Sequence, residues 1–215
     1  MSSGIGRRRE NARDESSTAY RERRAEIVRA AAGAFTSKGY SATSLSDVAR
    51  AAETDRATLY YYFSGKAEIL DEVVSGEVER NTVRAEEIRA GTDPAPEKLR
   101  RMLGELMASY AENHPFLYVF VQENLSHVGT ELEEWAQRMR RLNRRYEEAL
   151  VGVVSDGVEE GTLQVTGEPR IVAYGLLGMF AWTHRWFNPQ TSTVSAQQIA
   201  ETFADTVIAG LVRSS

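Results

Sequence analysis

Residues 43–66 read TSLSDVARAAETDRATLYYYFSGK. Two short helices are expected here, over about 45–52 and 55–63, because each begins at a residue that favours a helix N-cap, Ser44 and Asp55. A tight turn separates them. Two short helices joined in this way form a helix-turn-helix, whose second helix is sized to enter a DNA major groove.

The side chains of this stretch divide into an inner and an outer face. The inner face is expected to pack on Phe35 of a preceding helix over 18–38, and it consists of Leu45, Val48, Ala49, Leu59 and Phe63. Three consecutive tyrosines, residues 60–62, cannot all be buried in so short a helix, so at least one is expected to be exposed. The second helix therefore presents polar and aromatic groups outward.

The charge of the chain is unevenly distributed. Its 215 residues include 26 Lys and Arg against 31 Asp and Glu, a net charge of −5, which by itself argues against a nucleic-acid partner. Residues 1–66, however, hold 12 basic and 8 acidic side chains, a net +4, whereas the other 149 hold 14 and 23, a net −9. The opposite charges indicate two segments with different tasks.

Long helical patterns separated by Gly and Pro breaks fill the rest of the chain. Helices are expected at about 18–38, 66–91, 96–112, 115–126, 130–160, 168–187 and 195–212. With the two short helices this predicts an all-α protein of nine helices. We expect a flexible basic arm over 1–17, a helix-turn-helix domain over 18–65, and a helical domain for ligand binding and dimerisation over 66–215.

Several classes of function are excluded by what the sequence lacks. The absence of cysteine excludes disulfides, zinc ribbons and thiol catalysis. The three histidines are scattered, and neither a nucleophile elbow nor a phosphate-binding glycine loop occurs. No apolar run approaches the roughly 20 residues that span a bilayer, and the N-terminus has no secretory apolar region. We expect a cytoplasmic protein with no enzyme activity, metal, cofactor or membrane partner.

The order of small, apolar and aromatic residues resembles the tetracycline-repressor (TetR) family. The matching positions are Gly39-Tyr40, Thr43-Ser44, Val48-Ala49, Ala52, Thr58 to Phe63 and Lys66. The resemblance implies a nine-helix dimeric repressor that leaves a palindromic operator when a small apolar effector binds. Two residues depart from the pattern. Glu53 stands where Gly is usual, so either a strained backbone or a slightly different turn is expected there, and Gly65 stands where Ser or Asn often caps the next helix.

The resemblance also implies DNA contacts. Phosphates would be held by Thr43, Ser44, Tyr60, Tyr62 and Lys66, and base edges would be faced by Ser46, Arg56, Ala57, Thr58 and Tyr61. Arg56 is the candidate for bidentate reading of a guanine, because a guanidinium matches its two major-groove acceptors. The arginines of the arm, at positions 7–9 and 13, either contact the minor groove or phosphates beside the helix-turn-helix, or only solubilise the chain.

The C-terminal segment is expected to hold the effector between its middle helices. Apolar and aromatic candidates for the lining are Met102, Leu106, Tyr110, Phe116, Phe120, Trp135 and Tyr146, for which ordinary core packing is the alternative. Helices 168–187 and 195–212 are the expected dimer interface, since in the family the corresponding pair forms a four-helix bundle across the dimer axis.

Residues 182–189, WTHRWFNP, resemble a segment of acyl-CoA-responsive members of the family. An acyl-CoA thioester of lipid or steroid catabolism needs cations for its phosphates beside an apolar slot. The candidate cations are Arg141, Arg145 and Arg185, and Trp182 or Trp186 would stack or pack against the ligand. Alternatively, the arginines form a solvated face paired with glutamates. Other functions left open are a drug-efflux regulator responding to a lipophilic compound, an α-helical acyl-CoA-binding enzyme and a helical protein-binding adaptor.

Overall fold

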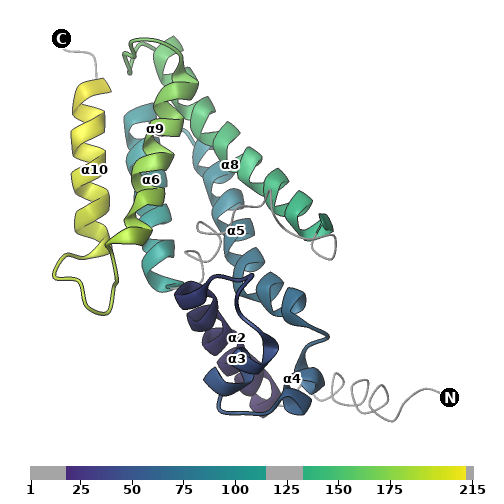
Figure 1. Cartoon of the computed structure of the whole chain (residues 1–215). Helices are drawn as coiled ribbons and strands as arrows, with labels where there is room; N and C mark the ends of the chain where they lie inside the picture. The colour runs from purple at the N-terminus through teal and green to yellow at the C-terminus, as the bar shows by residue number, and fades with distance from the viewer. Residues whose placement is uncertain (1–17, 115–132, 212–215) are drawn as a thin grey trace. The chain divides into compact units, whose positions relative to one another are not determined.

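The regular elements of the protein are all helices in the residues that its computed structural model describes, 18–114 and 133–211 (Figure 1). The described residues form eight α-helices and one 3-10 helix. The predicted all-α class is therefore confirmed. The expected basic arm over 1–17 and the expected helix over 115–126 lie outside the described residues.

The helix-turn-helix forms where the capping residues predicted it. Helix α2 spans Thr18–Lys38, α3 Leu45–Ala51, α4 Arg56–Tyr62 and α5 Lys66–Ala90. Ser44 and Asp47 form a reciprocal capping box at the start of α3, and the Asp55 carboxylate accepts a hydrogen bond from the Thr58 amide at the start of α4. Both N-caps expected from the sequence are confirmed.

A small apolar core holds these helices together. Phe35 of α2 is buried with four of the five residues predicted for the inner face, Val48, Ala49, Leu59 and Phe63. The fifth, Leu45, is only half-buried. Side chains of the first turns of α5 are also fully buried, namely Ile69, Leu70, Val73 and Val74.

The chain divides into two compact units, and the division falls within α5. Residues 18–75 belong to the first unit, and residues 76–114 and 134–211 to the second. The sequence placed this boundary before Lys66, at the start of the helix. The first turns of α5, with the buried Ile69, Leu70 and Val73, belong to the first unit.

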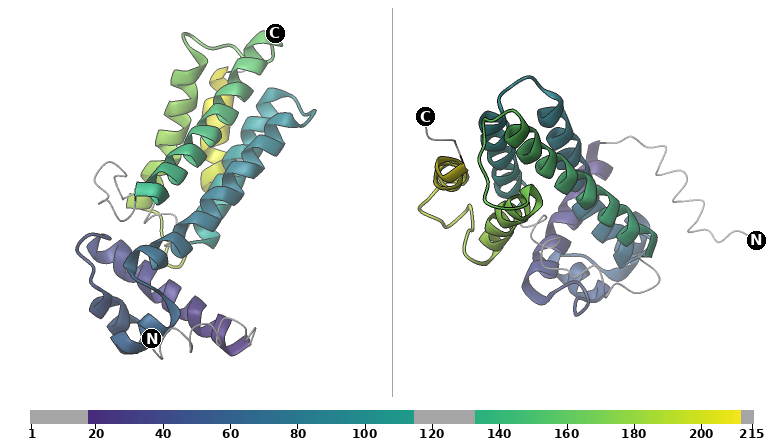
Figure 2. Two further views of the ribbon diagram at one scale, coloured as in Figure 1. Left: turned by 90° about the vertical axis from the view of Figure 1, so that its right-hand side faces the viewer. Right: turned by 90° about the horizontal axis from the view of Figure 1, so that it is seen from above.

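The second unit is a bundle of long helices. It contains the later part of α5 together with α6 (Ala95–Glu112), α8 (Glu133–Glu159), α9 (Pro169–Ala181) and α10 (Ala196–Leu211), which run alongside one another in Figure 2. Its elements are also joined by polar contacts: Arg100 of α6 pairs with Asp205 of α10 at 2.7 Å. None of the helices in the described ranges is long and apolar enough to span a membrane.

Helix α9 ends earlier than the sequence predicted. The expected helix over 168–187 stops at Ala181, and a 3-10 helix, η3 (Trp182–Arg185), follows. The Thr183 hydroxyl is buried and donates to the Phe180 carbonyl, and the Trp186 amide donates to the Thr183 carbonyl, three residues back. The tighter turn is therefore stabilised by contacts that the run of aromatic residues does not reveal.

The turn between α3 and α4 is a Schellman motif with Glu53 at its left-handed position. Glu53 has a φ of +49°, its amide donates to the Arg50 carbonyl at 3.2 Å, and the Thr54 amide donates to the Ala49 carbonyl at 2.9 Å. Of the two expected outcomes, a strained backbone or a different turn, the structure keeps the turn and places Glu53 in the left-handed region. A Cβ in this conformation crowds the following carbonyl, which glycine avoids.

Replacing Glu53 by glycine is expected to stabilise the protein. Relief of the left-handed strain should raise the free energy of unfolding of Glu53→Gly by about 1 kcal/mol. Denaturant unfolding of the wild type and the variant measures this difference. Glu53→Ala is the control, because it removes the same charge and keeps the Cβ; equal gains in both variants would contradict a backbone origin.

Candidate nucleic-acid interface and effector site

Helix α4 has one buried anchor and an exposed polar face. Leu59 is buried, whereas Arg56 and Ala57 are exposed and Thr58 is half-buried. At its start, hydrogen bonds from the Thr58 backbone and side chain lower the pKa of Asp55, so this carboxylate is committed to capping. Arg56 and Ala57, which the sequence predicted to face base edges, therefore lie on the exposed side of α4.

Arg56 and Tyr60 lie together one helical turn apart on the exposed side of α4. An Nη atom of Arg56 donates to the Tyr60 hydroxyl at 3.3 Å, and its guanidinium carbon lies 5.9 Å from the centre of the tyrosine ring. Tyr60 is 40% exposed. A cation and a phenol thus form a continuous surface able to meet a phosphate or a base edge.

The other two tyrosines of α4 pack against Tyr20 of α2. The ring centres of Tyr20 and Tyr62 are 4.9 Å apart, and those of Tyr20 and Tyr61 are 6.0 Å apart. Burial raises the pKa of Tyr62 above its usual value. The prediction that the three tyrosines cannot all be buried is confirmed, with Tyr60 as the exposed one.

The start of α3 offers two exposed hydroxyls and one buried hydroxyl. Ser44 and Ser46 are exposed, as a phosphate or base contact requires. Thr43 is only 1% exposed, and its hydroxyl lies 2.8 Å from the Gly39 carbonyl oxygen. The structure thus puts the Thr43 side chain inside the fold and not on the surface where the sequence expected a phosphate contact.

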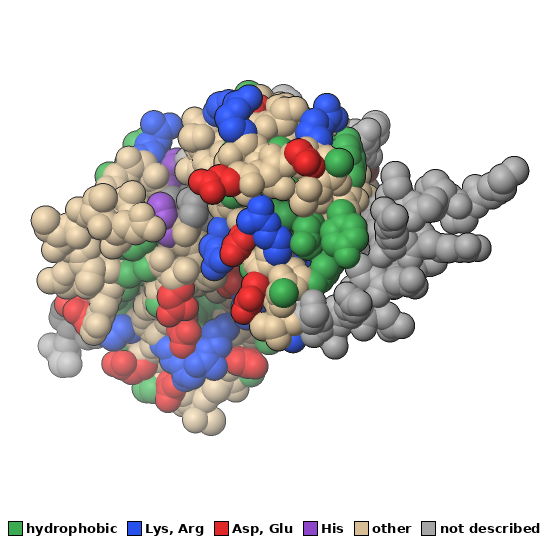
Figure 3. Space-filling model, turned by 90° about the horizontal axis from the view of Figure 1, so that it is seen from below, with side chains coloured by type: hydrophobic (Ala, Val, Ile, Leu, Met, Phe, Trp, Pro, Cys, Tyr) green, Lys and Arg blue, Asp and Glu red, His purple; other side chains and the backbone are tan. Residues whose placement is uncertain are grey.

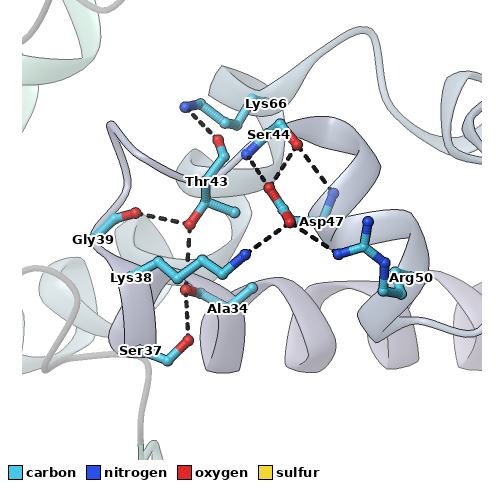
Figure 4. A network of polar contacts seen from close by, with 9 residues as sticks. All are labelled: Ala34, Ser37, Lys38, Gly39, Thr43, Ser44, Asp47, Arg50 and Lys66. Carbon is cyan, nitrogen blue, oxygen red and sulfur yellow. Dashed lines mark hydrogen bonds and ion pairs between the residues drawn. The ribbon is translucent and has the colours of Figure 1, made fainter.

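A network of charged side chains surrounds the Asp47 carboxylate (Figure 4). Lys38 of α2 donates to it at 2.8 Å, Arg50 at 3.2 Å, and the Ser44 amide and hydroxyl at 3.0 and 2.6 Å. The hydrogen bonds from Lys38 and Ser44 hold the pKa of Asp47 far below its usual value. One acid therefore joins α2 to the first turn of α3.

Lys66 lies at the start of α5, with its ammonium group against the loop between α2 and α3. Its Nζ donates to the carbonyl oxygens of Tyr40 at 2.7 Å and Thr43 at 2.8 Å, the latter drawn in Figure 4. Nζ also lies 4.2 Å from the centre of the Tyr40 ring. Lys66 thus holds this loop in the structure, and the phosphate contact expected of it stays a prediction.

The surface charge around the helix-turn-helix is mixed and not uniformly basic. Residues 18–66 hold eight Lys and Arg and five Asp and Glu. Figure 3 shows basic and acidic side chains next to one another on one face of the molecule. Within residues 18–66, affinity for phosphates must therefore come from particular cations more than from a general positive field.

Most of the predicted effector-lining residues lie in the core of the second unit. Met102, Leu106, Tyr110 and Trp135 are buried, and burial raises the pKa of Tyr146. Three of them line a cavity of about 10 Å³, the space of a single water molecule, namely Met102, Leu106 and Tyr146. The other two candidates, Phe116 and Phe120, lie outside the described residues.

The predicted cationic candidates lie at the surface of the same unit. Arg141 is exposed and has no ion-pair partner in the described part of the chain, beside a groove of about 430 Å³ that also includes Arg140 and Arg144. Arg145, in contrast, forms a bidentate pair with Glu86 of α5 at 2.8 and 2.7 Å. The arginine face is therefore only partly neutralised.

The aromatic segment after α9 is largely exposed. Trp182 is 57% exposed and Trp186 49%, and the Arg185 guanidinium carbon lies 4.5 Å from the centre of the Trp182 ring. The small cavity beside Met102, Leu106 and Tyr146 is not lined by Trp182, Arg185 or Trp186.

Comparison with known proteins identifies the two parts of the chain. Residues 27–73 match the model of bacterial regulatory proteins of the tetR family, and residues 92–211 match the tetracyclin repressor-like C-terminal domain. The second match alone covers more than half of the chain. The protein belongs to the TetR family.

Its relatives include a protein described as a ketosteroid transcriptional regulator and one named as a fatty acid metabolism regulator protein. The transcriptional repressor KstR2 of Mycobacterium tuberculosis is 26% identical over 194 residues, which cover 89% of this chain and 94% of that protein. The solved KstR2 structure superposes with a TM-score of 0.80 at 23% identity, covering 89% and 96% of the two chains.

Two further structures contain acyl-CoA. AibR in complex with isovaleryl coenzyme A and operator DNA has a TM-score of 0.67 at 20% identity, and FadR of Bacillus subtilis in complex with stearoyl-CoA has 0.63 at 21%. Each match covers 86% of this chain and 97% of the other, and at these identities the likeness shows the fold alone. The two family matches and the likeness to the repressor KstR2 show that the chain is a helix-turn-helix transcriptional repressor of the TetR type, and not an enzyme.

Sequence reasoning missed several residues that shape the interface of this TetR-family repressor. Lys38 and Arg50 share Asp47, Tyr20 supports two tyrosines of α4, and Arg24 joins α2 to α5. The three-residue spacing of Asp47 and Arg50 was a readable signal, since such pairs are neighbours on a helix. The other contacts join residues far apart in the sequence, so no local pattern indicates them.

The Asp47 network is expected to make stability depend on pH. Folding lowers the pKa of Asp47. Its carboxylate therefore contributes to the free energy of unfolding above the pKa of the unfolded chain, near 4, and this contribution is lost as the pH falls from there toward the lower pKa of the folded protein. Asp47→Asn should therefore be less stable than the wild type at pH 7, and the difference should shrink between pH 5 and pH 2. Thermal unfolding measures this, with the exposed Glu22→Gln as the control; a constant difference across this range would contradict the assignment.

Proposed function

We propose that this repressor acts as a homodimer on a near-palindromic operator and releases it when an acyl-CoA thioester binds the second unit. The protein has one form that binds the operator and one that does not. The ligand shifts the equilibrium between them only if its affinity for the form that does not bind the operator is the higher one. The observation that carries the effector proposal is the exposed arginine face of α8 in a unit whose core is apolar.

The DNA-reading part of the proposal rests on α4. Its exposed residues Arg56, Ala57 and Tyr60 form a short polar surface on a helix of major-groove size. Ser44 and Ser46 on α3, Thr58, Tyr61 and Tyr62 on α4, and Lys66 at the start of α5 are proposed to support this contact. For Lys66 a phosphate would have to compete with the Tyr40 and Thr43 carbonyls.

The dimer proposal rests on an exposed apolar stripe of α9. Ile171 is 68% exposed and Tyr174 44%, with the exposed glycines 175 and 178 between Tyr174 and Trp182. Small residues allow a second helix to approach closely, and an apolar stripe of this kind favours a protein interface. A symmetric pair would present two α4 helices to successive major grooves.

The acyl-CoA proposal is favoured over a merely lipophilic effector by the cations. Arg141 and Arg144 have no ion-pair partner within the described residues, and Arg185 lies over an exposed indole. Phosphates use guanidinium groups of this kind, whereas a neutral drug does not. AibR and FadR were crystallised with acyl-CoA ligands, which supports the same class of effector here.

Arg56 is expected to read one guanine. Arg56→Ala should weaken binding to the operator by roughly 1–3 kcal/mol and relax selectivity at a single base pair, because one bidentate contact is lost. Binding to a duplex selected from a random pool, and to all its single-base variants, measures both effects. Arg29→Ala removes the same charge from an exposed site on α2; a uniform loss across all variants of the duplex would overturn the base-reading role.

Acyl-CoA thioesters are expected to release the operator, whereas the corresponding free fatty acids are not. Fluorescence anisotropy of a labelled operator, titrated with acyl-CoA of increasing chain length, measures the release. After correction for any change in operator affinity, Arg141→Gln should require about a tenfold higher acyl-CoA concentration for release than the wild type. Arg101→Gln on α6 is the charge-matched control. Release by free fatty acids at equal concentration would instead favour a lipophilic effector.

A further inference from the structure

Arg24, in the N-terminal third of α2, connects three elements of the first unit through one side chain. Its Nε donates to Glu72 at 3.1 Å, one Nη donates to Glu68 at 3.1 Å, and the other donates to the Tyr62 carbonyl oxygen. The guanidinium carbon also lies 4.1 Å from the centre of the buried Phe63 ring. The side chain is 22% exposed, so it is largely enclosed by these partners.

The contact with Tyr62 falls at the end of α4. Tyr62 is the last residue of this helix, and its carbonyl is one of those that have no partner within the helix. A guanidinium there supplies a donor and places a positive charge at the negative end of the helix dipole. Arg24 therefore acts as a C-terminal cap delivered from α2.

The contacts with Glu68 and Glu72 fall on the first two turns of α5. Glu68 also accepts a hydrogen bond from the Ser64 amide at 2.6 Å, which ties the loop between α4 and α5 to the same cluster. Burial would raise the pKa of Glu68, and the hydrogen bonds from Ser64 and Arg24 bring it below its usual value. The Glu68 carboxylate therefore stays charged and keeps the guanidinium in place.

The length of α4 makes such a connection necessary. A helix of seven residues is only marginally stable alone, so its direction depends on groups outside it. Asp55 fixes its start and Leu59 anchors its middle, while Arg24 fixes its end against α5. A change at this end would turn the exposed Arg56 and Tyr60 away from their base and phosphate partners.

We propose that Arg24 is a positioning residue for operator recognition, which sets the orientation of α4 relative to the first turns of α5 without contacting DNA. The inference rests on DNA reading by α4 and names the group that gives this helix its direction. Because Glu68 and Glu72 share the same guanidinium, a rotation of the first turns of α5 acts on the end of α4 through Arg24.

Two variants with opposite charge changes test the proposal. Arg24→Gln removes a positive charge, whereas Glu72→Gln removes a negative charge and leaves Arg24 present. The measurement is the ratio of the Kd for a scrambled duplex to the Kd for the operator duplex selected from a random pool, both of equal length. Both variants should lower this ratio about tenfold. If only the net charge mattered, Arg24→Gln would weaken binding to both duplexes equally and Glu72→Gln would strengthen binding to both equally, so the ratio would stay the same.

Exposed residues of the same helix provide matched controls. Arg29→Gln and Glu22→Gln repeat the two charge changes on α2 and should leave the ratio unchanged. Arg24→Lys keeps the charge but lacks the planar fork that reaches Tyr62, Glu68 and Glu72 together, so it should not restore the ratio. Restoration by lysine would overturn the proposal.

Thermal unfolding of each variant separates misfolding from misplacement. If Arg24→Gln is unfolded at the assay temperature, Glu72→Gln carries the test, because it loses only one of the partners of the guanidinium. An unchanged ratio in folded Glu72→Gln, or an equal loss of affinity for both duplexes, would overturn the proposal. The proposed base reading by Arg56 fails separately, since it predicts a loss of selectivity at one base pair only.

Discussion

The constraint on which the first unit depends is the shortness of its recognition helix. Seven residues form fewer than two full turns, and most backbone groups of such a helix lack intrahelical partners. Its geometry is therefore imposed by Asp55 at one end, by Arg24 at the other and by Leu59 in the core. The rest of the unit serves to supply and hold these three contacts.

The cations near the proposed DNA surface are likewise held by partners within the protein. Lys38 and Arg50 are bound to Asp47, and Lys66 is bound to two backbone carbonyls. Internal partners orient these side chains and also reduce the net field of the unit, which holds acidic residues among its basic ones. Binding DNA then exchanges internal partners for phosphates, so the gain in affinity for each cation is smaller than for a free one.

The second unit separates its apolar groups from its cations. Met102 and Leu106 are buried in its core, whereas Arg141 and Arg185 are exposed. A ligand with an acyl chain and phosphates needs both kinds of group. Entry of an acyl chain into so small a cavity would require the core to open. Such an opening would make the affinity for the ligand differ between the closed and the open state of the second unit.

Much of the helix-turn-helix was predictable because its signals are local. Ser44 and Asp55 are caps that act on amides three residues away, and the spacing of Val48, Leu59 and Phe63 follows the period of a helix. The unfavourable backbone position of Glu53 was also predictable, because a turn that favours glycine is defined by a few neighbouring residues. The early end of α9 was not predictable, because it depends on how Thr183 is buried.

The uneven charge, the two caps, the aromatic run and the family were determined by the sequence alone, since each is a property of neighbouring residues or of composition. Only the tertiary structure decided which tyrosine is exposed, that Thr43 is buried, that Lys66 holds the α2–α3 loop, and that Arg24 joins three elements. The physical reason is distance along the chain. Arg24 lies 38 residues from Tyr62 and 48 from Glu72, so their contact exists only after the core has brought three helices together.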